Sequence, residues 1–125
     1  MPNKRSTYHS RLDEALAYIA RHMKERIQLG HLSEASGVSK RTLGYLFLRT
    51  YGITPMAFLK RERLRKANML LQHAEPSTTT VCSVARECGF AHMGQFSLDY
   101  KRLFGESPSD TLHQSQTGEE SPERS

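Results

Sequence analysis

The chain has 125 residues, enough for one domain or for two very small subdomains that share a core. A charged fraction of 25% and a hydrophobic fraction of 37% are typical of a soluble globular protein. The best apolar run, LGYLFL, is far shorter than the roughly 20 residues that span a bilayer. The first residues, MPNKRSTYHSR, lack the apolar stretch of a secretory signal, so we expect a cytoplasmic protein without a membrane partner.

The net charge of +5 is unevenly distributed along the chain. Arg124, Glu119, Glu120 and Glu123 lie after residue 112, which leaves 17 basic and 10 acidic residues, or +7, before it. A basic core favours a polyanionic partner such as nucleic acid.

The chain has 2 cysteines, Cys82 and Cys88, which we place on one helix. Their spacing points them to different faces, which disfavours a disulfide. Together with His92 they resemble part of a metal site, but a fourth ligand at a suitable spacing is missing. We therefore expect no metal and no cofactor.

The first predicted element is an amphipathic helix over about residues 10–25. Its apolar residues recur at spacings of three and four, at Leu12, Leu16, Ile19 and Met23.

The segment IQLGHLSEASGVSKRTLGYLFLRTYGITP follows, and it predicts a short helix, a tight turn and a second helix. The first helix breaks at Gly37, and the second starts after Ser39 as its N-cap. The second helix then stops at Gly52, shortly before Pro55.

Pro55 opens a longer predicted helix, PMAFLKRERLRKANMLLQ, which is followed by the loop HAEPSTTT. VCSVARECGF is a short helix that Gly89 ends, where the turn needs a positive backbone angle. A further helix runs from near His92 to about Leu103 and ends at Gly105, and no segment shows a strand pattern. On this helix the pattern assigns Phe96, Tyr100, Leu103 and Phe104 to the core.

The most informative feature is an internal repeat. SGVSKRTLGYLFLRTYGITP and CGFAHMGQFSLDYKRLFGESP each contain a turn glycine, an apolar anchor and two apolar residues four apart. Each copy closes with a glycine three residues before a proline. A short helix, a glycine-bearing turn and a second amphipathic helix form the outline of a helix-turn-helix, and two copies are more specific than one.

These residues resemble the DNA-binding domain of the AraC/XylS family of bacterial transcription regulators, over about residues 9–112. The resemblance lies in LSEASGVSKRTLGYLF, in GITPMAFLKRERLRKANMLL and above all in VARECGFAHMGQFSLDYKRLFGESPSDTL. The last stretch is similar to the family signature I-A-x-x-x-G-F-x-x-x-x-x-F-S-x-x-F-K-x-x-x-G-x-S-P, with Val84 in place of Ile and Tyr100 in place of Phe.

The resemblance implies an all-α fold of about seven helices, with two helix-turn-helix subdomains joined by a long linker helix. We assign the subdomains to 9–54 and 74–112 and the linker helix to 55–73. The remaining segments are a flexible arm over 1–8 and a disordered acidic, Ser-rich tail over 113–125.

The implied function is a sequence-specific regulator of transcription that binds double-stranded DNA. Two recognition helices, over about 40–50 and 92–103, would enter successive major-groove segments. A linker helix of this length spans roughly 25 Å, which is compatible with two recognition helices separated by about one DNA turn of roughly 34 Å.

The second helix of a helix-turn-helix presents its outward residues to base edges. Arg41 is the best candidate for bidentate recognition of guanine, and Gln95 for adenine, while Leu98 and Met93 can contact thymine methyl groups. A phosphate contact or a solvated surface position remains the alternative for Arg41. The full set of base-reading candidates is Arg41, Gly44, Tyr45, Met93, Gly94, Gln95, Ser97 and Leu98.

Affinity should come mostly from phosphate contacts, assisted by backbone amides at the helix starts. The residues that would make these contacts are Lys40, Arg41, Arg49, Lys101 and Arg102. Many family members carry an arginine where this chain has Tyr45 and another where it has Leu98, so a known target sequence does not transfer. Gly94 lies in the first turn of the second recognition helix. There the missing side chain would let the backbone approach either the groove or its own scaffold.

Two other functions remain to be weighed. GFAHMGQF has glycines at the spacing of a phosphate-binding loop, but Gln95 and Phe96 stand where Lys and Ser or Thr should follow, so we expect no enzyme. The alternative function is a helical protein-interaction module without specific DNA readout, for example one that contacts RNA polymerase, as regulators of this family also do.

Many family members carry a separate ligand-binding and dimerisation domain before this one. We therefore expect a small-molecule effector to act only through a domain outside this chain. The stretches GFAHMGQFSLDY and FGESPSDTL resemble members with that extra domain, which favours a piece of a longer regulator over a small stand-alone one.

Overall fold

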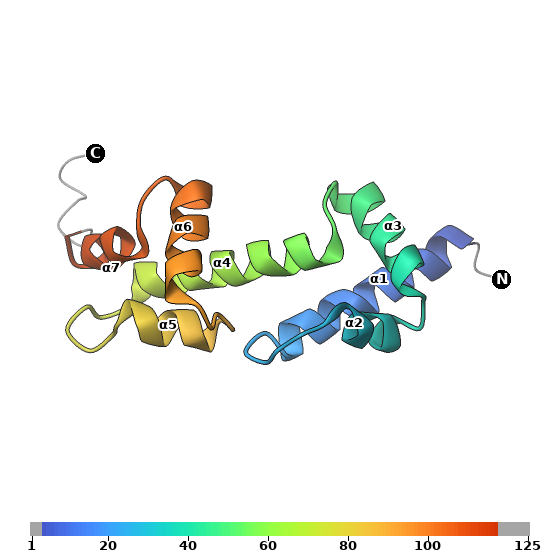
Figure 1. Cartoon of the computed structure of the whole chain (residues 1–125), viewed down its shortest axis with the longest axis horizontal. Helices are drawn as coiled ribbons and strands as arrows, with labels where there is room; N and C mark the ends of the chain where they lie inside the picture. The colour runs from blue at the N-terminus through green and yellow to red at the C-terminus, as the bar shows by residue number, and fades with distance from the viewer. Residues whose placement is uncertain (1–3, 118–125) are drawn as a thin grey trace. The chain divides into compact units, whose positions relative to one another are not determined.

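The computed structural model describes residues 4–117, which fold into seven helices without a strand among them (Figure 1). This confirms the predicted all-α class. None of these helices is long and apolar enough to cross a membrane. The helices are α1 (Lys4–Arg21), α2 (Leu29–Ser36), α3 (Lys40–Tyr51), α4 (Pro55–His73), α5 (Val81–Glu87), α6 (Met93–Phe104) and α7 (Pro108–Thr117).

The chain divides into two compact units, Met1–Arg61 and Glu62–Ser125. The boundary falls inside α4, because Phe58 and Leu59 pack into the first core while later residues of the helix pack into the second. The helix predicted over 55–73 is therefore present, but its two ends are parts of the two subdomain cores rather than a separate connector.

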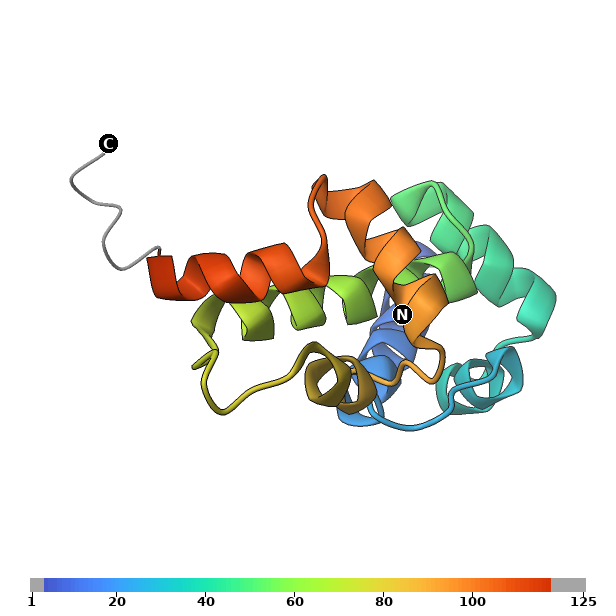
Figure 2. The ribbon, with the colours of Figure 1, turned by 60° about the vertical axis from the view of Figure 1, so that its left-hand side comes forward.

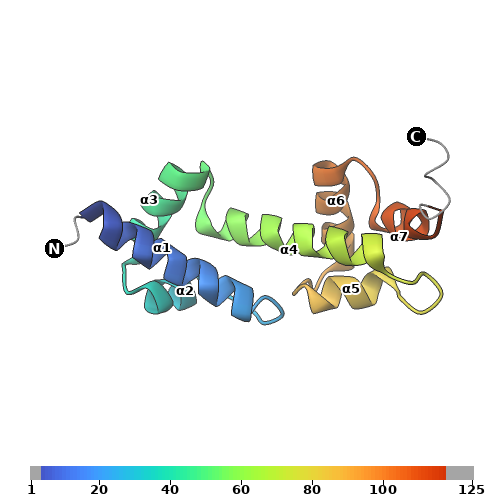
Figure 3. The ribbon, with the colours of Figure 1, turned by 180° about the vertical axis from the view of Figure 1, so that it is seen from behind.

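In the first unit, α1 and α2 lie side by side and α3 packs against both (Figure 3). Phe47 of α3 meets Phe58 edge to face, with ring centroids 5.2 Å apart, so α3 is fixed against the start of α4. The buried core consists of Leu12, Ala15, Ile19, Ile27, Leu32, Leu43, Leu46, Phe47, Phe58 and Leu59.

A tight turn joins α2 to α3. Gly37 adopts φ 75, a left-handed conformation that side chains other than glycine rarely take. The residue before it, Ser36, is fully buried, and its hydroxyl donates to the Leu32 carbonyl at 2.8 Å. Ser39 then caps α3, because its side chain accepts from the Thr42 amide at 3.1 Å. The turn and cap predicted at Gly37 and Ser39 are thus confirmed.

In the second unit, α5, α6 and α7 pack against one another and α7 lies alongside the second half of α4 (Figure 2). The turn between α5 and α6 repeats the first one, with Gly89 at φ 94 and a small, fully buried residue, Cys88, before it. This confirms the role predicted for Gly89. The buried core consists of Leu64, Ala67, Leu71, Val84, Ala85, Cys88, Phe96, Tyr100 and Leu112.

The outer helices differ from the predicted boundaries. α1 begins at Lys4, so residues 4–8 are helical rather than part of a flexible arm, and it ends at Arg21 rather than near residue 25. α7 continues to Thr117, into the segment predicted as a tail. Ser107 and Asp110 cap its start through reciprocal side chain to backbone hydrogen bonds. The rest of the predicted arm and tail, residues 1–3 and 118–125, lies outside the described residues.

One core assignment on α6 is wrong. Leu103 is 44% exposed, whereas Asp99, which the apolar pattern passed over, is only 7% exposed. Asp99 lies one turn after Phe96 and beside Tyr100, on the side of the helix that faces the core.

A buried polar network connects three helices of the second unit. The Tyr100 hydroxyl donates to Thr111 Oγ1 at 2.7 Å and accepts from Asn68 Nδ2 at 2.8 Å. Thr111 in turn donates to the carboxylate of Glu106. Burial raises the pKa of the Tyr100 hydroxyl above its ordinary value, and the hydrogen bonds with Thr111 and Asn68 act in the opposite direction. The network thereby ties α4, α6 and α7 together.

Removing the Tyr100 hydroxyl should destabilise this unit. Tyr100→Phe leaves two polar partners without their hydrogen bond, which costs about 1–3 kcal/mol of unfolding free energy. Urea unfolding followed by circular dichroism measures the loss. Tyr45→Phe is the matched control, because the Tyr45 ring is 54% exposed and its variant should change stability by less than about 0.5 kcal/mol. Equal effects of the two variants would contradict the structural role of the network.

Stability should fall between about pH 9 and pH 11 because of Cys88. Burial raises the pKa of the Cys88 thiol from 9.0 to about 11. Between these values the unfolded chain loses the thiol proton while the folded chain keeps it, so the stabilisation is present below pH 9.0 and lost as pH rises through about 11. The loss is on the order of 2 kcal/mol.

The comparison between wild type and Cys88→Ser isolates this contribution, because the variant lacks the thiol. Serine should fit the site, since it occupies the corresponding buried position, Ser36, in the first unit. We expect the stability difference between the two proteins to change between about pH 8 and about pH 11 under reducing conditions. A difference that stays constant over this range would show that the thiol does not titrate in the expected way.

Candidate nucleic-acid interface

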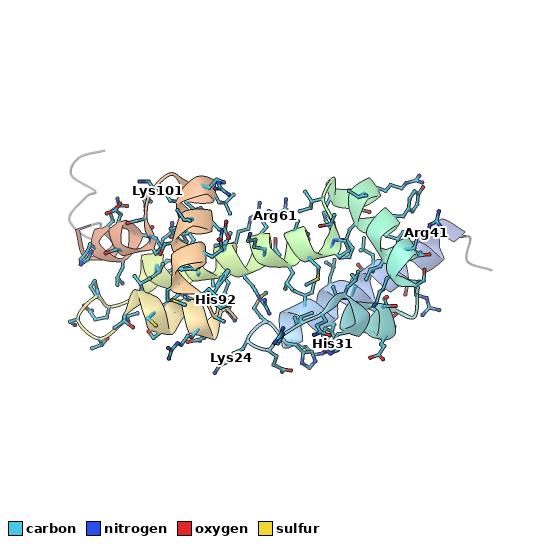
Figure 4. The ribbon with its side chains drawn as sticks, viewed as in Figure 1. Lys24, His31, Arg41, Arg61, His92 and Lys101 are labelled. Carbon is cyan, nitrogen blue, oxygen red and sulfur yellow. The ribbon has the colours of Figure 1, made fainter. Side chains whose placement is uncertain are left out.

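α3 and α6 are the second helices of the two helix-turn-helix units, and each is 12 residues long. Both end on a left-handed glycine, Gly52 at φ 76 and Gly105 at φ 81. Their starts differ, because the Ser39 side chain caps α3, whereas His92 at the start of α6 makes no side-chain cap. His92 and Arg41 are labelled at these two helix starts in Figure 4.

The exposed face of α3 is cationic. Lys40 and Arg41 lie exposed in its first turn, and Arg49 is exposed in its last turn. Arg49 Nη1 donates to the Tyr45 hydroxyl at 2.8 Å, and its guanidinium carbon lies 6.0 Å from the centre of the Tyr45 ring. Because the Tyr45 hydroxyl oxygen accepts a hydrogen bond from Arg49, the Tyr45 O–H group remains available to donate one to another molecule.

The exposed face of α6 carries a side-chain amide, a hydroxyl group and an apolar side chain. Gln95, Ser97 and Leu98 are exposed, and Leu98 reaches 61% exposure. Cations appear only later on this helix, at Lys101 (Figure 4) and Arg102. The two helices thus present different chemistry along otherwise equivalent faces.

Met93 does not lie where the sequence analysis expected it. Its side chain is half-buried and packs against the core of the second unit, although it begins α6. The sequence placed it among the outward residues of α6, whereas in the structure it packs against the cluster that contains Phe96 and Tyr100. A contact between Met93 and a thymine methyl group stays a prediction.

Asp99 is the functional candidate that the sequence analysis missed. Gln95 Nε2 donates to its Oδ1 at 3.1 Å, and Arg102 Nη1 lies 3.7 Å from the same oxygen. A carboxylate at helical spacing from both Gln95 and Arg102 is a signal that the sequence contained, since residues three and four apart share a face.

The glycines within α3 and α6 have no structural reason to be glycine. A Cβ at Gly44 or at Gly94 would meet no neighbouring atom within 4 Å, and neither residue has a positive φ. The expectation that Gly94 allows close approach to its own scaffold is therefore wrong. The other half of that expectation, that Gly94 lets an outside molecule approach the backbone of α6 closely, stays a prediction.

The fold and these two faces define a class of protein, a paired helix-turn-helix domain. A family profile described as "Helix-turn-helix domain" matches residues 32–114. Among solved structures, a "probable AraC family transcriptional regulator" from Rhodopseudomonas palustris superposes with a TM-score of 0.74 at 38% identity, over 84% of this chain and 96% of that one. The DNA-binding domain of AdpA, solved with a target DNA, gives a TM-score of 0.77 at 25% identity, over 86% and 95% of the two chains.

Curated relatives lead to the same family. The XylDLEGF operon transcriptional activator of Pseudomonas putida is 31% identical over 102 residues, which is 82% of this chain and 32% of the activator. The "probable thc operon regulatory protein" of Rhodococcus erythropolis is 37% identical over 98 residues, 78% of this chain and 30% of the regulator. The chain belongs to the AraC/XylS family of helix-turn-helix regulators. It spans about a third of the length of these two relatives.

Replacing Gly44 by alanine should stabilise the first unit. The added methyl group has open space, and alanine in a helix interior is favoured over glycine by about 0.5–1 kcal/mol. Thermal unfolding of Gly44→Ala should therefore show a raised midpoint.

Gly52→Ala serves as the control, because its φ of 76 strains any side chain and the same added methyl group should lower the midpoint. A destabilised Gly44→Ala would mean that Gly44 serves the fold after all.

Proposed function

We propose that this chain binds double-stranded DNA in a sequence-specific manner and regulates transcription from within the cytoplasm, without catalysis of its own. Each unit presents its second helix, α3 or α6, to the major groove, and the two helices read successive groove segments. The observation that carries the proposal is that α3 and α6 each expose hydrogen-bond donors and cations. Each helix also contains a glycine, Gly44 or Gly94, at which a Cβ would meet no neighbouring atom. The structure of the related AdpA domain in complex with a target DNA supports it.

In this proposal α3 reads guanine and anchors the phosphate backbone. Arg41 stands in the first turn, where helix-turn-helix proteins contact base edges, and its planar fork matches guanine O6 and N7. Tyr45 and Arg49 form a hydrogen-bonded pair whose donors suit a phosphate oxygen. Lys40 adds a further positive charge near the start of the helix.

The second helix, α6, reads A·T-rich sequence. Gln95 pairs with adenine, Leu98 contacts a thymine methyl group, and Ser97 reaches a base or a phosphate. Gly94 keeps the first turn free of side-chain bulk, which allows the groove edge to approach the helix backbone. Lys101 and Arg102 contribute phosphate contacts.

Contacts with RNA polymerase and a response to a small-molecule effector belong to the whole regulator in this proposal. The polymerase would be a partner in addition to DNA. An effector would act through a domain other than this one.

Selection of bound duplexes from a random library, with wild type and Arg41→Ala, tests the proposal. Loss of Arg41 should relax base preference at one position by about 5- to 150-fold, the value of one bidentate pair. Lys101→Ala is the matched control, because loss of a phosphate contact lowers affinity for all sequences alike and reduces the slope of log K against log salt by about 0.9.

Two results would count against parts of this proposal. If Arg41→Ala weakens every duplex equally, Arg41 contacts phosphate rather than guanine. If duplex affinity does not change with salt concentration, the DNA-binding function is wrong and a helical protein-interaction module becomes the better explanation.

A further inference from the structure

Asp99 lies between two of the proposed DNA contacts without being one itself. Its side chain is only 7% exposed, and its Oδ1 lies 3.1 Å from Gln95 Nε2 and 3.7 Å from Arg102 Nη1. The corresponding position of α3 holds Leu46, which is buried among apolar side chains. Since burial of a carboxylate is unfavourable compared with an aliphatic side chain, the shared fold does not itself require an acid at this position.

The chemistry of the contact restricts the Gln95 amide to one orientation. A carboxylate only accepts hydrogen bonds, whereas a glutamine amide has an acceptor oxygen on one side and two N–H donors on the other. Gln95 therefore turns its nitrogen toward Asp99, because the reversed amide would bring two acceptor oxygens together. One N–H is used in this contact, and the second N–H and the oxygen Oε1 remain for a ligand on the exposed side.

We propose that Asp99 is a positioning residue for base recognition, which orients the Gln95 amide so that it reads adenine. In the bidentate pair of glutamine with adenine, Oε1 accepts from the N6 amino group and an N–H donates to N7. These are the two groups that the contact with Asp99 leaves available. An amide that turns freely also offers donors to guanine and an acceptor to cytosine, so its preference for adenine is weaker.

This inference rests on the proposed DNA-binding function, and its test uses the complete chain with a library of duplexes. The variants are Asp99→Asn, Gln95→Ala and the double variant. Asp99→Asn keeps the size of the side chain but can both donate and accept, so either amide orientation of Gln95 is allowed. Asp99→Leu introduces the residue type that α3 has at the corresponding position, Leu46. It is the variant to use if the buried asparagine of Asp99→Asn prevents folding.

Wild type should prefer adenine at one position by about tenfold or more, and Asp99→Asn should reduce this preference by at least about threefold. Base preferences read by α3 should stay unchanged. Gln95→Ala should abolish the adenine preference, and Asp99→Asn should have no further effect on it in the Gln95→Ala background. Glu87→Gln is the charge-matched control, because it removes an exposed acid on α5 and should leave the preference at its wild-type value.

The outcomes separate this inference from the proposed function. If Gln95→Ala loses the adenine preference and both folded Asp99 variants keep it, the positioning role is overturned while DNA recognition stands. An equal loss in Glu87→Gln would also overturn it, since the effect would then come from net charge. If wild type selects no sequence from the library, the proposed function itself is wrong.

Discussion

The structure depends on the tight turn that joins the two helices of each helix-turn-helix. In both units the chain reverses at a glycine with positive φ, Gly37 or Gly89, directly after a small, fully buried residue. A larger residue before the glycine would separate the two helices, and a side chain on the glycine would strain the backbone. Because this turn fixes the start of the following helix, it determines which side chains of α3 and α6 are buried and which are exposed.

The same turn is supported by different interactions in the two units. In the first unit, Ser36 donates to the carbonyl of Leu32, and Ser39 caps the following helix. In the second, Cys88 fills the equivalent space as an apolar side chain, and no side chain caps α6. The second unit has instead a buried network through Tyr100, which connects α6 to α4 and α7. Two copies of one sequence plan thus reach similar local folds through different hydrogen bonds.

This difference extends to the exposed faces. On α3 the pair of Tyr45 and Arg49 points polar donors outward from a helix whose buried side is fully apolar. On α6 the acid Asp99 lies on the buried side, where its carboxylate accepts a hydrogen bond from Gln95 and forms an ion pair with Arg102. In the proposed function the two similar helices read different bases, which is the property that an asymmetric DNA site would require.

Local signals in the sequence were enough to predict the helices from α2 to α6, the two turns and the duplicated plan, because glycines, prolines, caps and apolar spacing act over a few residues. They were not enough to predict the bounds of α1 or the extent of α7. Leu43 and Phe47, for example, define the buried side of α3 from their spacing alone. The tertiary structure alone decided the burial of Asp99, the exposure of Leu103 and the partial burial of Met93. Those outcomes depend on which neighbouring helix covers each turn of α6, and helix periodicity carries no information about a neighbour that comes from elsewhere in the chain.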